Sequence, residues 1–174
     1  QWMNKRQKTV GMLAVLLLVV AAAVFALTRG GKDEAPQAGN LLVNGDFSAV
    51  TDGMPDGWST GMWVTSAGAS YLEAVTLADG TTAALVENAA SNDARFEQAV
   101  AVRENTTYKL TARVMAENCG EEYKGANVSF SGIYGTSADL HDTAGQWETL
   151  TLYARTGKGQ REVTVMARLG GYGS

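Results

Sequence analysis

The chain has 174 residues, 45% of them hydrophobic, and a formal net charge of −4 at pH 7. A protein that binds nucleic acid non-specifically needs a basic patch, and none appears outside the N-terminal tail, so we set that function aside. The single cysteine, Cys119, excludes an internal disulfide, and its polar, turn-like surroundings indicate an incidental loop residue rather than a catalytic thiol.

Residues 10–27 carry no charged side chain. A run of about 20 apolar residues spans a bilayer as a helix, because a helix satisfies its own backbone hydrogen bonds in lipid. The sequence therefore predicts a transmembrane helix over residues 9–28. The alternative is a signal peptide cleaved near Ala26, after which the rest of the chain would be secreted.

The charges that flank this run predict its orientation. Lys5, Arg6 and Lys8 lie before it, whereas the basic residues after it are mixed with acidic ones. Because positive residues favour the cytoplasmic side, residues 1–8 are predicted to form a cytoplasmic tail and everything after the helix to lie outside. Residues 29–39 are predicted to be a linker, since they are small, charged and punctuated by glycine and proline.

From residue 40 onward the chain has the pattern of short strands. Residues 40–47 combine an apolar run with the turn chemistry of Asn44, Gly45 and Asp46, which predicts a first strand that runs into a turn. Further strands are predicted, most of them by alternation of apolar and polar residues, at residues 60–64, 71–75, 82–87, 95–102, 107–116, 125–132, 147–154 and 161–169. The predicted fold class is all-β, an antiparallel β-sandwich or jelly roll, preceded by one transmembrane helix.

Four motifs follow one another in a recognisable order. They are Asn-Leu-Leu-Val-Asn-Gly-Asp-Phe at 40–47, Pro-Asp-Gly-Trp at 55–58, Phe-Glu-Gln-Ala-Val-Ala-Val with Thr-Thr-Tyr-Lys-Leu-Thr-Ala at 96–112, and Gly-Gln-Trp-Glu at 145–148. This order resembles the carbohydrate-binding modules of the family 4/9/22 type over about residues 40–169. The resemblance implies a galactose-binding-domain-like jelly roll that binds a glycan or polysaccharide without catalysing a reaction.

The resemblance has one gap, at the C-terminal end. Such modules close with a strand that carries an acidic pair and pairs with the first strand, and nothing similar follows Leu169. The domain at 40–174 is therefore expected to lack its last strand, which leaves an edge for a protein partner to fill. The structural Ca²⁺ of such modules is held from both ends of the domain, so Asp46 is a candidate ligand, with a simple turn residue as the alternative.

Aromatic residues inside these motifs are predicted to be core, whereas aromatic residues outside them are candidate platforms for a sugar ring. The candidate platforms are Trp63, Tyr71 and Tyr134. By alternation, Arg95, Glu97 and Arg113 point away from the core, so they are predicted to line a concave face with the platforms; the alternative for each of them is a solvated surface.

Three functional hypotheses remain. The first is a membrane-anchored, extracytoplasmic carbohydrate-binding module that holds a surface protein or enzyme near glycan. The alternative is a structural or protein-interaction jelly roll, an accessory or assembly subunit without a sugar site. The third is a non-catalytic segment of a larger enzyme. Catalysis by this chain itself is not expected, because no spacing supports the two carboxylates of a glycosidase and the only histidine, His141, lies in a polar loop.

Overall fold

The computed structural model of the chain describes residues 15–26 and 39–171. Every regular element in these residues is a β-strand, and every pairing between strands is antiparallel. The strands are β1 (Val15–Ala26), β2 (Val50–Thr51), β3 (Met54–Pro55), β4 (Ser59–Met62), β5 (Ser70–Thr76), β6 (Thr82–Asn88), β7 (Ala94–Ala101), β8 (Thr107–Glu117), β9 (Ala126–Ser131), β10 (Glu148–Arg155) and β11 (Glu162–Leu169).

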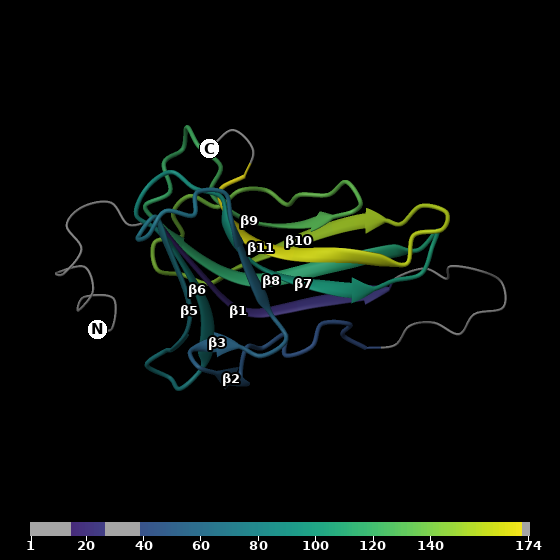
Figure 1. Ribbon diagram of the computed structural model, residues 1–174, viewed down its shortest axis with the longest axis horizontal. Helices are drawn as coiled ribbons and strands as arrows, with labels where there is room; N and C mark the ends of the chain where they lie inside the picture. The colour runs from purple at the N-terminus through teal and green to yellow at the C-terminus, as the bar shows by residue number, and fades with distance from the viewer. Residues whose placement is uncertain (1–14, 27–38, 172–174) are drawn as a thin grey trace.

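Two sheets form the body of the protein (Figure 1). A five-stranded sheet has the order β10-β8-β1-β6-β5, a four-stranded sheet has the order β4-β7-β11-β9, and β2 and β3 form a short separate ribbon. One continuous hydrophobic cluster takes side chains from both larger sheets. The predicted fold class, an all-β antiparallel sandwich, is therefore confirmed.

Alternation along the strands decides which side chains enter the core. In β8, Tyr108, Leu110, Ala112 and Val114 are buried in the cluster, as the period of two predicts. The residues between them lie on the outer face of the five-stranded sheet. Every second residue of β8 from Tyr108 to Val114 therefore packs into the main core, and a smaller apolar cluster of Val75, Ala83, Leu85 and Met115 forms separately from it.

The opening segment was predicted to be a strand that runs into a turn; the turn is confirmed, whereas the strand is wrong. Residues 41–47 form turns, because Asn44 and Phe47 both take positive φ angles, of 50° and 58°. The turns bring Phe47 into the core, where it is fully buried and its ring lies 5.0 Å from that of Trp58. The indole Nε1 of Trp58 donates to the Asn44 carbonyl. This hydrogen bond joins the motif at 55–58 to the motif at 40–47.

The helix predicted for residues 9–28 is also not what the structure shows. Residues 15–26 form β1, in the centre of the five-stranded sheet, and the described residues contain no helix long and apolar enough to cross a membrane. Periodicity cannot separate the two structures here, because β1 is apolar at every position, as a membrane helix is, and both structures satisfy the backbone hydrogen bonds. The rest of 9–28, the tail at 1–8 and nearly all of the linker at 29–39 lie outside the described residues.

Replacing Phe47 by alanine should destabilise the protein by about 3–5 kcal/mol, because a fully buried ring is lost against Trp58. Urea denaturation followed by tryptophan fluorescence measures the change. The matched control is Tyr153→Ala, since Tyr153 is 57% exposed on β10 and its loss should cost less than about 0.5 kcal/mol. Equal costs for the two variants would contradict the role given to Phe47.

Candidate functional site

The candidate site lies on the outer face of the four-stranded sheet. The inward residues of these strands, such as Phe96, Val128 and Ala167, belong to the core, so their neighbours face outward. The strand registers arrange the outward residues in rows that cross the sheet. One row is Gly61, Arg95, Arg168 and Asn127, and the next is Ser59, Glu97, Met166 and Ser129. At about 4.8 Å between strands, each row is roughly 15 Å long.

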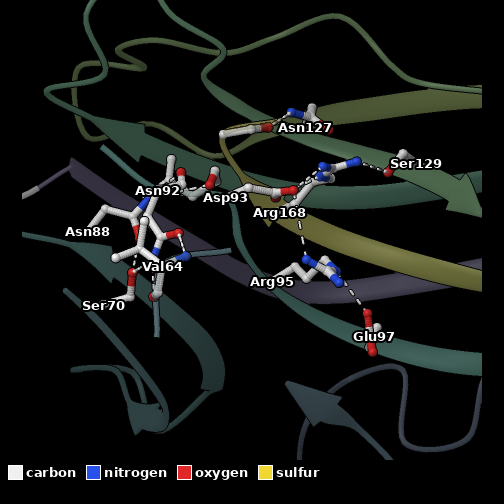
Figure 2. Close-up of polar contacts among 12 residues, drawn as sticks. Val64, Ser70, Asn88, Asn92, Asp93, Arg95, Glu97, Asn127, Ser129 and Arg168 are labelled. Atoms are coloured by element: carbon white, nitrogen blue, oxygen red, sulfur yellow. Dashed lines mark hydrogen bonds and ion pairs between the residues drawn. The ribbon is translucent and has the colours of Figure 1, made fainter. Parts of the chain in front are cut away.

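A chain of ion pairs covers this face (Figure 2). Asp93, just before β7, accepts two hydrogen bonds from the Arg168 guanidinium, from Nε at 3.1 Å and from Nη2. The same carboxylate lies 3.7 Å from Nη1 of Arg95, whose Nε donates to Glu97 at 2.8 Å. Two guanidinium groups and two carboxylates thus balance each other, and the floor formed by these four side chains has no net charge.

The two arginines have different roles on this floor. Arg168 donates hydrogen bonds to the Asp93 carboxylate and, from Nη1, to the Ser129 hydroxyl at 3.5 Å. Its side chain is only 11% exposed. Arg95 is 25% exposed, and its Nη2 lies directly over Gly61. A Cβ added to Gly61 would stand 2.8 Å from that nitrogen. Arg168 therefore holds the floor together, and Arg95 presents a donor to the groove.

Two exposed aromatic residues stand beside the floor. Trp63 follows β4 and is 79% exposed, and Tyr134, in the loop after β9, is fully exposed. The loop of Trp63 is held by the residues just before β7, since Trp63 N donates to the Asp93 carbonyl and Val64 N to the Asn92 side chain. Together with Asp93, Arg95 and Arg168, the two rings line a groove of about 770 Å³.

The structure brings four of the six predicted ligand-binding residues together. Trp63, Arg95 and Tyr134 line the groove, and Glu97 joins them through its bond to Arg95. Tyr71 on β5 and Arg113 on β8 belong to the other sheet instead. Arg113 lies 6.0 Å from the centre of the Trp147 ring, a cation–π contact on the outer face of that sheet.

Sequence reasoning missed the two residues that organise the floor, Asp93 and Arg168. Arg168 lies in a strand that was predicted, and alternation with the buried Ala167 and Leu169 would have placed it outward. Asp93 gives no such signal, because it lies in the turn before β7 and its partner is 75 positions away in the chain.

Asp46 was the candidate calcium ligand. Its Oδ1 accepts hydrogen bonds from the backbone N and the hydroxyl of Ser48, and these bonds lower the pKa of the carboxyl group. This is the geometry of a turn residue. Within residues 15–26 and 39–171, no group of three or more His, Cys, Asp or Glu side chains gathers in a metal-binding arrangement. Calcium binding through Asp46 stays a prediction.

Comparisons with protein-family models, with curated proteins and with solved structures find no match for this chain.

A second, smaller cavity of about 320 Å³ is lined by Cys119, together with Asn118, Tyr123 and Lys124. The fold brings Cys119 close to His141, since Cys119 N donates to the His141 carbonyl, but the imidazole Nδ1 is engaged with the carbonyl of Gly120. Burial raises the pKa of the thiol to about 11. A nucleophilic cysteine needs the opposite shift.

The Cys119 thiol should therefore react slowly in the folded protein. A pKa of about 11 against an ordinary value near 9 leaves roughly a hundredfold less thiolate at pH 8. Labelling with Ellman's reagent at pH 8, in buffer and in denaturant, measures the two rates. The native rate should rise with pH up to about 11, because deprotonation supplies the reactive form. Equal rates in the native and unfolded protein would contradict the burial of this thiol.

Proposed function

We propose that this chain is a carbohydrate-binding module, a jelly-roll domain that binds a glycan in the groove between Trp63 and Tyr134 and is not itself a catalyst. The observation that carries the proposal is that two exposed aromatic rings line the same groove as a polar, charge-balanced set of side chains. The extracytoplasmic location predicted from the N-terminal charges belongs to the same proposal.

The aromatic rings supply the apolar part of such a site. A sugar ring has faces made of C–H groups, which pack against an aromatic face, while its hydroxyls point outward at the edge. A ring that is 79% exposed, as Trp63 is, contributes little to folding. It is available to cover a ligand, and so is the fully exposed Tyr134.

The floor supplies the polar part. Arg95 lines the groove and has Nη2 as a donor for a sugar hydroxyl, while the hydrogen bond from its Nε to Glu97 holds the guanidinium group in place. A phosphate or sulfate ligand would need positive charge in excess, whereas the arginines here are matched by Asp93 and Glu97. These features favour a neutral, hydroxyl-rich ligand.

Trp63→Ala and Tyr134→Ala should each weaken retention on the glycan that the wild-type protein binds by about 30-fold, equivalent to about 2 kcal/mol for an exposed anchor at a binding site. The melting temperature should barely change. Tyr71→Ala is the matched control, because Tyr71 is 47% exposed but lies on the other sheet. Affinity gel electrophoresis with soluble polysaccharides gives the binding constants. Equal losses for all three variants would contradict the position of the site.

Gly61→Ala should weaken glycan binding at little cost in stability, because the added methyl group displaces the flexible end of Arg95 from the floor. We expect a loss of about tenfold, the effect of one misplaced charged hydrogen bond. Gly157→Ala is the control, since a Cβ there meets no atom within 4 Å. Unchanged glycan binding in Gly61→Ala would show that Arg95 does not contribute to glycan binding.

A glycan array with the wild-type protein tests the proposal as a whole. Retention of at least one neutral glycan, lost in Trp63→Ala, is the expected result. If no glycan on a broad array is retained, the alternative of a protein-interaction jelly roll takes the place of this proposal.

A further inference from the structure

Strand β1 is unusual in that it comes early in the chain yet lies in the middle of its sheet. It pairs with β6 through Val15–Val19 and with β8 through ten residues between Leu16 and Ala26. In the described residues, β6 and β8 have no pairing with each other. Without β1, the five-stranded sheet would separate into two pairs, β10–β8 and β6–β5, each with an open edge.

The composition of β1 is equally unusual for a strand in this position. Its twelve residues are all apolar, and the apolar run extends from residue 10 to residue 27. The outer face of β8 carries Lys109, Thr111 and Arg113, whereas the residues of β1 that pair with them are Phe25, Ala23 and Ala21. Phe25 is 37% exposed there. A strand selected only for this sheet needs no such uniform apolarity, since polar residues suit an outer face.

Two environments satisfy the backbone of such a segment equally well. Between β6 and β8, its N–H and C=O groups bond to neighbouring strands; in a bilayer, they would bond within a helix. The apolar run of 18 residues reaches the length that a membrane helix needs. One segment cannot occupy both places at once.

We propose that residues 15–26 have two alternative partners, the facing edges of β6 and β8 and a lipid bilayer. When the apolar run enters a bilayer as a helix, β1 leaves the sheet and the edges of β6 and β8 open. In water without lipid, the same segment closes the sheet. This exchange does not depend on glycan binding, because the groove lies on the other sheet.

Two substitutions separate the two states. Ala23→Asp places a carboxylate on the outer face between Lys109 and Arg113, where it suits the strand, but the same charge opposes entry into a bilayer. Leu18→Pro removes a ladder bond at a position that pairs with both β6 and β8, yet proline is tolerated in membrane helices.

The experiment follows backbone hydrogen exchange by mass spectrometry in the full chain, with and without vesicles of phosphatidylcholine mixed with phosphatidylglycerol. With vesicles, amides of β6 and β8 in the wild-type protein should exchange at least about tenfold faster, while those of β7 and β11 stay protected. Ala23→Asp should keep β6 and β8 protected and bind vesicles more weakly. Leu18→Pro should lose this protection without vesicles and still bind them.

Several outcomes would overturn the proposal. One is a wild-type chain that binds vesicles with β6 and β8 as protected as in water, since β1 would then have stayed in the sheet. A second is a wild-type chain that does not bind vesicles. A third is Leu18→Pro with full protection of β6 and β8 in water, because the protection of these two strands would then not depend on their pairing with β1.

Discussion

The carboxylate of Asp93 lies between two guanidinium groups, and the geometry of the groove depends on this arrangement. A charge that is half removed from water is tolerated only when it is matched, so each member of the chain from Arg168 to Glu97 fixes the next. The network joins β7 to β11, the two central strands of the four-stranded sheet. It leaves the floor without net charge.

Most of the fold could be predicted from the sequence because burial in a sandwich has a period of two. β7, β8, β10 and β11 each show this period, and all four were predicted within one or two residues. The N-terminal run could not be predicted in this way. All twelve residues of β1 are apolar, so the segment has no period of two, and length alone then favours a helix.

The candidate site could be predicted only in part, for a different reason. Alternation indicates which side of its strand a residue occupies, but not to which sheet the strand belongs. Arg95 and Arg113 were therefore grouped together, although they lie on different sheets. Trp63 and Tyr134 were identified because they lie outside the fold-forming motifs, and both line the groove. The contact of Asp93 with Arg168 depends on tertiary structure, which no local pattern encodes.

The position of β1 also has a consequence for synthesis on the ribosome. Its main partner, β8, ends at Glu117, about ninety residues after Ala26. At ordinary rates of elongation, the apolar segment is complete about 5–20 s before β8 can pair with it. During that interval the nascent chain presents an unpartnered apolar segment to whatever binds it first. The order of emergence, rather than the final energies alone, therefore influences which of its two partners the segment meets.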